Sequence, residues 1–398
     1  MLLLVSCKEV IQENPYKDSL CFLMVTAGYP EGCEEFIRQG VEVIIEEINT
    51  GSKYRSRTND EGVAIFEVPY GIYRINVNDI GEQDFFNGTS DKVVLTQKDV
   101  EVKVPLLHSK AGTIVIKEIY CGGCKKLPQE GTYQSDKYVI LHNNDLSVRY
   151  LDGLCMGTLY PYNSNGSNPF VSRDKETKEL VYKDYVALAQ AVWQFGGDGT
   201  SFPLQPGEDA VVCFCGAIDH TVQYPLSVNL NKPDYFVCYN ETYFNNTVYH
   251  PTPGDKISPE RYLNVVIKTG RANAYTFSIN SPAVVLFEPQ GMTMSEFVAI
   301  EGNVIQVPGS SVDKVTAVPL DWVMDAVEVF NGTSTANAKR LQASLDAGYV
   351  TLSGTYLSHT LMRKKDADLS AASGFEVLAD TNNSSNDFYE SEIQSLHE

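Results

Sequence analysis

TNDEGVAIFEVPYGIYRINV, residues 58–77, is the stretch that decides the fold class of this chain. It contains two runs of alternating or β-branched residues, 63–68 and 73–77, each preceded by turn-forming residues. Gly and Asn accept the backbone angles of tight turns, and Pro fixes one of those angles in advance. The stretch therefore predicts two strands joined by a turn at 69–71, a hairpin inside a β-sandwich.

Further strand-like runs at 41–48 and 100–106 predict one small all-β domain over residues 18–107. The stretch 58–77 resembles the carboxypeptidase regulatory-like, or transthyretin-like, β-sandwich family. The residues that match the pattern of that family are Asn59, Asp60, Gly62, Ala64, Phe66, Gly71 and Tyr73. The resemblance implies a non-catalytic spacer or an adhesion-like module.

Residues 108–398 again show strand-like runs with long connections, at 112–120, 137–145, 148–157, 202–221 and 346–365. This region resembles the lamin-tail domain, an immunoglobulin-like sandwich, with His142 where that family has an aromatic residue. The matching residues are Ile114, Ile116, Glu118, Ile119, Tyr120, Tyr138, Ile140, Leu141, Asn143, Asn144, Leu151, Gly153, Leu154, Leu204, Pro206, Gly207 and Glu208. Because the region is much longer than the core of that family, the resemblance implies a second β-sandwich with long insertions.

Two segments, PLDWVMDAVEVFNG (319–332) and VLADTNNSSNDF (377–388), resemble an uncharacterised family of Bacteroidetes-type lipoproteins. In that family an extended lamin-tail-like domain follows a regulatory-like sandwich, and no activity is established. The prediction is an all-β chain with two immunoglobulin-like or transthyretin-like sandwiches, 18–107 and 108–398. Residues 388–398 are acidic and are expected to be a frayed end.

The opening MLLLVSC ends in Leu4-Val5-Ser6-Cys7, which fits a bacterial lipobox, where the cysteine is acylated after cleavage. The polar run 8–17 that follows is suited to a tether. Residues 1–17 are therefore interpreted as residual signal and lipid-anchor tether, with Cys7 as the anchor. The apolar run is too short for a signal core, so we expect the natural start to lie upstream. A chance cysteine in an apolar stub is the alternative.

These features predict a protein of the cell envelope, lipid-anchored to the outer membrane and facing either the periplasm or the exterior. The 398 residues include 31 Lys and Arg against 51 Asp and Glu, a formal net charge of -20. Such a charge repels phosphate backbones and anionic lipid headgroups. We therefore expect no nucleic acid partner, and membrane contact through the lipid anchor only.

The chain has nine cysteines, and eight remain if Cys7 carries lipid. An even number outside the cytoplasm permits disulfides without specifying a pairing. Cys121-Gly-Gly-Cys124 follows a strand-like run, whereas a redox pair begins a helix, and a zinc knuckle needs a second such pair. The favoured interpretation is structural, with metal and redox roles left open.

Motifs for catalysis are absent from the sequence. There is no G-x-S-x-G and no H-E-x-x-H, and GGDG (196–199) lacks the Lys-Ser/Thr of a phosphate loop. We therefore predict that the chain is not an enzyme. The alternatives are an envelope hydrolase assembled from loops, with Asp219, His220 and Asp325 as suspects, or a structural surface component.

PDYFVCYNETYFNNTVYHP (233–251) interleaves aromatic rings with amides, a combination that suits sugar rings and their hydroxyls. It predicts a non-catalytic module that binds a glycan, a small nutrient or an envelope protein, in a role accessory to an outer-membrane transporter. For the segment itself, the favoured interpretation is that alternate rings fill a sandwich core, and a ligand surface is the alternative. The predicted ligand-binding residues are Tyr235, Tyr239, Asn240, Tyr243 and Tyr249.

DTNNSSNDF (380–388) is rich in the oxygen ligands that Ca²⁺ prefers, although its spacing is not that of an EF-hand. A calcium site at Asp380, Asn382 and Asp387 is therefore one hypothesis for this loop. Asn-rich turns also occur without metal, because Asn tolerates left-handed backbone angles. No other cofactor is expected.

Overall fold

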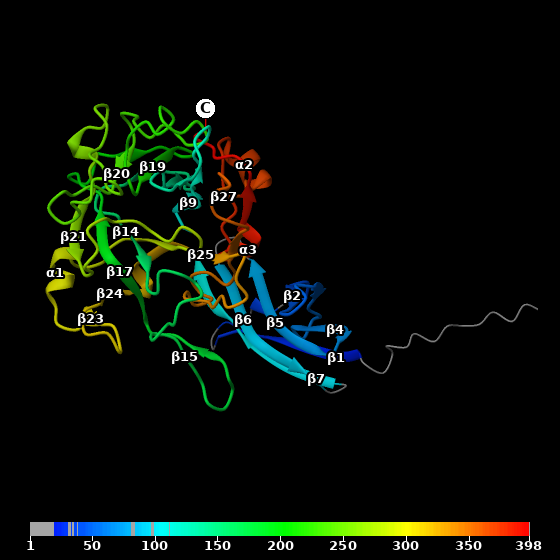
Figure 1. Cartoon of the computed structure of the whole chain (residues 1–398). Coiled ribbons are helices and arrows are strands. Elements are labelled where there is room, and N and C mark those ends of the chain that lie inside the picture. The colour runs from blue at the N-terminus through cyan, green and yellow to red at the C-terminus, as the bar shows by residue number, and fades with distance from the viewer. Residues whose placement is uncertain are drawn as a thin grey trace, which may run out of the picture. The chain divides into compact units, whose positions relative to one another are not determined.

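The computed structural model describes residues 20–30, 33, 36–37, 39–80, 84–96, 99–110 and 112–397. This part of the chain is mostly β-structure in several sheets, with short helices only (Figure 1). It divides into two compact units, one up to Asp79 with Gly88–Leu107 and the other Ile80–Asn87 with His108–Glu398. Cys7 and the predicted tether lie outside the described residues.

The first unit contains two sheets. One has the order β4-β1-β7, with β1 antiparallel to β4 and parallel to β7. Its strands are β1 (Leu20–Gly28), β4 (Val63–Pro69) and β7 (Asp99–Pro105). The other sheet, most of whose residues belong to this unit, has the order β3 (Lys53–Arg57), β2 (Glu42–Glu47), β5 (Gly71–Ile80), β6 (Asp84–Leu95) and β8 (Leu107–Lys110).

The hairpin prediction for 58–77 is wrong, because β4 and β5 belong to different sheets. β4 pairs with β1, placing Ala64 opposite Val25, and β5 pairs with β2, placing Ile75 opposite Ile45. The turn at Tyr70 therefore leads from one sheet to the other. A Cβ on Gly71 would lie 3.1 Å from the Tyr73 ring and 3.2 Å from the Glu47 side chain, so glycine allows a closer approach here than other residues would.

The second unit is built on two larger sheets. The six-stranded sheet has the order β20 (Phe236–Val237), β19 (Asp209–Cys213), β12 (Tyr138–Asn143), β9 (Ile114–Tyr120), β27 (Thr360–Arg363) and β28 (Phe388–Ser391). The larger sheet has the order β23 (Val304–Gln306), β24 (Lys314–Pro319), β17 (Tyr185–Gln194), β14 (Cys155–Leu159), β22 (Ala283–Phe287), β25 (Val323–Asn331) and β26 (Val350–Leu352), and β21 (Asn264–Lys268) pairs with β17.

One buried cluster holds these two sheets together. It contains Ile116 and Val212 from the six-stranded sheet and Trp193, Leu286 and Val329 from the larger one. Burial of apolar surface contributes roughly 25 cal/mol per Å², so this shared core stabilises the pair as a sandwich. The prediction of a mostly β chain is confirmed, whereas the immunoglobulin-like and transthyretin-like assignments stay predictions.

Short elements complete the second unit. Three strand pairs lie outside the large sheets: β10 (Cys124–Lys125) with β11 (Thr132–Tyr133), β13 (Arg149–Tyr150) with β18 (Pro203–Leu204), and β15 (Ser172–Arg173) with β16 (Leu180–Val181). The α-helices are α1 (Met294–Ala299), α2 (Ala367–Ser373) and α3 (Ser384–Asp387), and the short 3₁₀ segments include η3 (Pro259–Arg261) and η4 (Leu320–Trp322). Among the described residues, no helix is long and apolar enough to cross a membrane.

Residues 388–397, which the structure describes, pack within the second unit, so the expectation of a frayed end is wrong for them. β28 pairs with β27, and the Ser395 hydroxyl donates to the buried carboxylate of Glu118. Glu118 also accepts hydrogen bonds from the hydroxyls of Tyr138 (2.6 Å) and Thr360 (2.8 Å). A buried carboxylate needs such donors, and Glu118 therefore holds the C-terminal segment in place.

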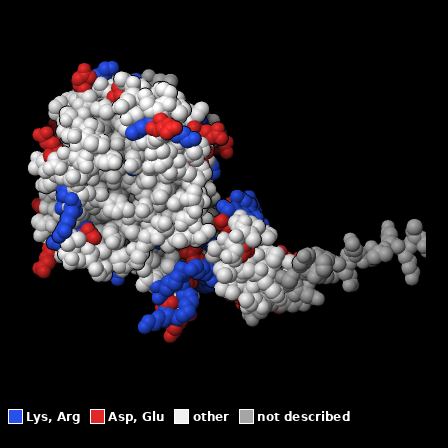
Figure 2. Space-filling view, in the orientation of Figure 1, with Lys and Arg blue, Asp and Glu red and all other residues white. Residues whose placement is uncertain are grey.

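Charged side chains are unevenly distributed over the second unit. Figure 2 shows basic side chains gathered over the hairpin β15–β16, where Arg173, Lys175 and Lys178 are exposed. Acidic residues alternate with them along this hairpin, as in Asp174, so it is a mixed-charge solvated arm.

Candidate functional site

A surface groove of about 450 Å³ in the second unit is the candidate functional site, and we call it the Arg261 groove. It lies where β18, the start of β19, the start of β20 and the end of η3 meet. Its outer residues are exposed, so it is open to solvent. The lining residues are Leu151, Ser201, Phe202, Pro203, Leu204, Glu208, Asp209, Ala210, Asp234, Phe236 and Arg261.

The floor of the groove is a guanidinium lying on two aromatic rings. The Arg261 guanidinium carbon is 4.7 Å from the ring centre of Phe236 and 5.6 Å from that of Phe202. Its Nη1 donates to the backbone oxygen of Asp234 at 2.8 Å. Stacking on aromatic faces restricts a guanidinium while leaving its other N–H groups free to donate. Arg261 is therefore a positioned hydrogen-bond donor.

One wall of the groove is the loop that contains GGDG (196–199). The Asp152 carboxylate accepts backbone N–H bonds from Gly199 (3.1 Å), Ser201 (2.8 Å) and Phe202 (2.8 Å). Burial acts to raise the pKa of Asp152, but these N–H donors hold it below its ordinary value. Gly197 has φ 103°, and a Cβ there would lie 2.0 Å from Asp152 Oδ1. The glycines therefore wrap a loop around Asp152 and position Phe202.

The opposite wall carries the carboxylates Glu208, Asp209 and Asp234. Asp209 is bonded to His142 Nδ1 (2.6 Å) and accepts a hydrogen bond from Lys117 Nζ (2.7 Å). Burial acts to raise the pKa of Asp209, but the His142 and Lys117 hydrogen bonds lower it overall. An ionised carboxylate of this kind accepts hydrogen bonds and is a poor proton donor. The groove thus offers acceptors on its wall and a donor on its floor.

The aromatic segment 233–251 does not form one platform. Tyr235 and Tyr239 pack against a buried cluster, and the Tyr239 ring stacks on His250 at 5.2 Å. Tyr243 and Tyr249 are 48% and 43% exposed. Asn240 accepts a hydrogen bond from the Tyr243 backbone N–H, which shapes the loop. Core filling therefore describes Tyr235 and Tyr239, whereas Tyr243 and Tyr249 are exposed enough to meet a ligand.

Sequence reasoning found the segment that borders the groove but named other residues in it. Asp234 and Phe236, which line the groove, flank the predicted Tyr235. Phe202 and Arg261 come from distant parts of the chain and were not predicted. Neither of their segments contains a recognisable ligand-binding motif. Phe202 follows a run of turn residues, and Arg261 ends the tripeptide PER of η3.

Two of the residues proposed as calcium ligands, Asp380 and Asp387, lie beside the Arg363 guanidinium instead. Asp380 accepts a hydrogen bond from Arg363 Nη1 at 2.9 Å, and the Asp387 carboxylate lies 3.8 Å from the same nitrogen. Asn382 is buried with φ 51°, the left-handed angle that Asn tolerates. Among the described residues no group of three or more His, Cys, Asp or Glu is arranged to hold a metal ion. Arg363 supplies the positive charge in this loop.

The suspected hydrolase residues are not brought together. His220 is bonded to the Tyr133 hydroxyl at 2.7 Å, and burial lowers the pKa of His220. The Asp219 carboxylate instead accepts the Thr221 hydroxyl, at 2.5 Å. Asp325 is buried beside Arg363, 2.5 Å from its Nη2. These three residues therefore do not form the hydrogen-bonded series of nucleophile, base and orienting acid that a hydrolase of this kind needs.

The eight cysteines that the structure describes are free thiols. Cys121 and Cys124 are buried, and burial raises the pKa of each to about 12. A redox pair requires a thiolate of lowered pKa, so this pair lacks the electrostatics of such a site. The structural interpretation of Cys121-Gly-Gly-Cys124 fits this geometry.

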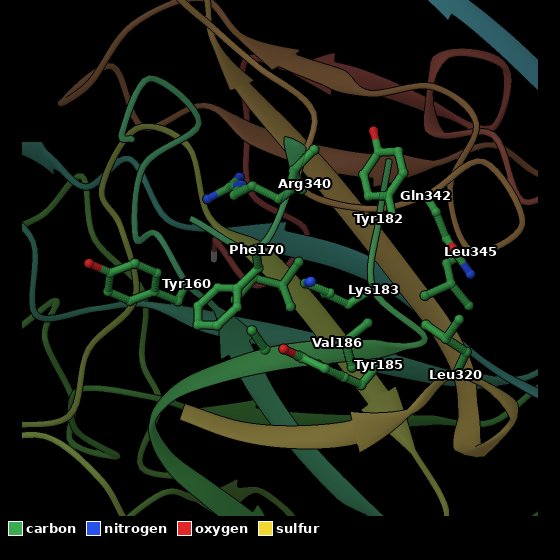
Figure 3. Close-up of a pocket in the computed structure, with 13 residues that line it drawn as sticks. Tyr160, Phe170, Tyr182, Lys183, Tyr185, Val186, Leu320, Arg340, Gln342 and Leu345 are labelled. Carbon is green, nitrogen blue, oxygen red and sulfur yellow. The ribbon is translucent and has the colours of Figure 1, made fainter. Parts of the chain in front are cut away.

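Protein side chains occupy most of a small cavity at the base of the hairpin β15–β16 (Figure 3). It holds about 20 Å³, room for roughly one water molecule. Phe170 packs edge-on against Tyr160 and Tyr185. The Arg340 guanidinium, which faces it, is bonded to Glu328 Oε1 at 2.8 Å and to backbone carbonyls. This cavity is therefore part of the packed core and is not a ligand site.

The fold is that of a DUF4876 family protein from Bacteroides thetaiotaomicron, which has a TM-score of 0.57 and 24% identity. The match covers 93% of this chain and 94% of that one. Residues 205–395 match the model of DUF4876, a protein family of unknown function. This matched region includes both segments, 319–332 and 377–388, that indicated an uncharacterised Bacteroides-type family. No curated protein matches the sequence.

Two more distant structural similarities involve surface proteins. A putative adhesin from Bacteroides ovatus has a TM-score of 0.21 and 12% identity over 50% of this chain and 86% of that one. The major pilin SpaD from Corynebacterium diphtheriae has a TM-score of 0.19 and 10% identity over 43% and 48%. Similarity at this level carries no argument about the present chain. The regulatory-like, lamin-tail-like and lipoprotein assignments stay predictions.

Proposed function

We propose that this chain is a non-catalytic binding module of the cell envelope and that the Arg261 groove binds a glycan. The observation that carries the proposal is the Arg261 guanidinium placed over the Phe236 ring, at 4.7 Å, in a groove that three carboxylates also line. Sugar hydroxyls both donate and accept hydrogen bonds, so they match a wall of acceptors and a floor of donors. The apolar side chains of Phe202 and Pro203 suit the C–H face of a sugar ring.

The location in this proposal rests on the sequence. Cys7 anchors the protein through acyl chains to the outer membrane, and residues 8–17 connect the anchor to the folded units. The net charge of -20 keeps the remainder of the surface away from anionic headgroups and nucleic acids. A binding module in this position would deliver glycans or nutrients to an outer-membrane transporter or contact another envelope protein.

Arg261→Met should weaken glycan binding at the groove by at least tenfold, because the floor loses its charged donors while keeping an apolar side chain. We would screen the wild-type protein on a glycan array and measure the best ligand by titration calorimetry. The control is Arg173→Met, which removes an exposed arginine of the hairpin β15–β16. An array without any bound glycan, or equal affinities for wild type and Arg261→Met, would show that the groove has another role.

Cys7→Ala should release the protein from the membrane, because a substituted cysteine cannot be acylated. The gene with its upstream region is expressed with and without the substitution, and membrane fractions and the intact mass are compared. Acyl mass on the wild type together with a soluble variant supports the anchor. If both forms are soluble and unmodified, Leu4-Val5-Ser6-Cys7 is a chance match and the envelope location is lost.

A further inference from the structure

A second cavity of the same unit is separate from the Arg261 groove. It holds about 240 Å³, and the residues that matter for its chemistry are Tyr160, Tyr162, Gln190, Arg271, Asp313 and Lys314. We call it the Tyr162 pocket. Tyr160 follows β14, Arg271 follows β21, Lys314 begins β24 and Gln190 lies within β17. Figure 3 shows the Tyr160 hydroxyl directed away from Phe170 and Lys183, so it does not point into the small filled cavity.

Two polar atoms of this pocket lack a well-formed hydrogen bond. The Tyr162 hydroxyl and the Gln190 side-chain oxygen are buried and make none among the described residues, although the Gln190 side chain lies close enough to Tyr162 to act on the pKa of its hydroxyl. Thr269 Oγ1, beside the pocket residue Gly270, is in the same condition. Leaving a buried polar group without a partner costs roughly 1–3 kcal/mol, and native structures rarely do so. A bound group that both donates and accepts would satisfy these atoms.

The backbone at Gln190, which lines the pocket, has an unusual conformation. β17 pairs with β24 up to Leu188 and with β21 from Ala191, so Gln190 lies where the neighbouring strand changes. Its φ is 62°, which is uncommon for a residue other than glycine. Thr269 N–H donates to the Gln190 carbonyl at 2.6 Å and holds this conformation. Backbone strain of this kind concentrates at ligand sites.

The rim of the pocket is basic on a chain that is strongly acidic overall. Arg271 and Lys314 are exposed, and within the described part of the chain neither forms an ion pair or a side-chain hydrogen bond. Asp313 is the one carboxylate among the lining residues, and its Oδ2 accepts the Ser310 hydroxyl at 2.9 Å. Burial and then the Asp313 charge raise the pKa of Tyr162, the Gln190 side chain lowers it by less, and the hydroxyl therefore keeps its proton.

We infer that the Tyr162 pocket binds a carboxylate-bearing sugar ring, a uronic acid unit. The carboxylate meets Arg271 and Lys314, for which a guanidinium fork is well suited. The ring hydroxyls satisfy Tyr162 and Gln190, and Tyr160 supplies an aromatic wall. This site and its ligand class go beyond the proposed groove and do not depend on it.

The test compares glucuronic acid with glucose, two probes that differ in the carboxylate. Binding to the full chain is measured by saturation-transfer NMR and titration calorimetry. Glucuronic acid should bind at least tenfold more tightly than glucose. Arg271→Met should abolish this preference, whereas Tyr162→Phe should weaken both sugars several-fold, since it removes only the hydroxyl. Arg173→Met is the matched control and should leave both affinities unchanged.

Several results would overturn the inference. Equal affinity for the two sugars, or glucuronic acid binding that survives Arg271→Met, would remove the carboxylate contact. The absence of any binding would remove the site. Loss of glucuronic acid binding in Arg261→Met, with Arg271→Met unchanged, would move the ligand to the Arg261 groove. Thermal unfolding of each variant verifies that the fold is intact, and Gln190→Asn offers a second variant because Asn tolerates the positive φ.

Discussion

Arg363→Met should lower the free energy of unfolding of the second unit by about 3–5 kcal/mol, the cost of breaking a buried ion pair from one side. Arg363 is buried and bonded to Asp325 (2.5 Å) and Asp380 (2.9 Å), with Asp387 at 3.8 Å. Its Nε also donates to the carbonyl of Ile116 at 2.8 Å. Methionine would fill the space but would leave three buried carboxylates without their cation.

Urea denaturation followed by tryptophan fluorescence measures this effect, because the two tryptophans, Trp193 and Trp322, are both buried in the second unit. The control is Arg149→Met, which breaks an exposed pair with Asp145 and should cost about 0–1 kcal/mol. A loss for Arg363→Met as small as that for Arg149→Met would mean that the carboxylates find other donors.

The same cluster shows why sequence reasoning could find the loop 380–388 but not its cation. The density of Asp and Asn in this loop suggested a calcium site, and nothing in its composition pointed to Arg363. Composition cannot distinguish a metal from a guanidinium that arrives on another strand, and here β27 brings Arg363 and β25 brings Asp325. Only the packing of the six-stranded sheet on the larger one places these residues together, and such contacts join distant parts of the chain.

For the fold, the sequence likewise indicated individual strands but not which strands pair. Alternation along 63–68 and 73–77 correctly indicated the strands β4 and β5, whose buried faces carry Ala64, Phe66, Tyr73 and Ile75. It could not name the partner strands, because a period of two fixes which face is buried and says nothing of the neighbour. β4 therefore pairs with β1, an apolar run that the turn pattern did not reveal.

Candidate sites depended still more on long-range placement. The aromatic segment 233–251 contributes Asp234 and Phe236 to the Arg261 groove, which is completed by Phe202 and Arg261. The Tyr162 pocket had no signal in the sequence. Its polar atoms become conspicuous only because their neighbours in the fold leave them without partners. A missing hydrogen-bond partner can be recognised only in the folded structure.

The pH dependence of stability should reveal that the Arg363 cluster holds one cation for three carboxylates. Burial raises the pKa of Asp387 to about 7, with Arg363 opposing and Asp380 adding to the increase. In the unfolded chain an aspartate titrates near 3.9. Between these values the folded state holds a proton that the unfolded state has lost, so this contribution to stability is present below about pH 4 and disappears as the pH rises through about 7.

Asp387→Asn should remove this dependence, because the amide is neutral at every pH. Its oxygen can still accept from Thr381 N–H, where the carboxylate bond is 2.9 Å, and its nitrogen can donate to the Thr381 hydroxyl. Between pH 4.5 and pH 8 the free energy of unfolding of the wild type should fall by about 2–4 kcal/mol relative to that of the variant, as follows from the raised pKa of Asp387. Urea denaturation at each pH measures this difference.

The matched control is Asp184→Asn, an exposed position, whose stability curve should run parallel to that of the wild type. Parallel curves for wild type and Asp387→Asn would mean that Asp387 is ionised throughout and that Arg363 alone balances the cluster. A wild type that instead gains stability over the variant as the pH rises would reverse the sign of the Asp387 shift. Since both variants remove one negative charge, the comparison separates the buried site from the general effect of net charge.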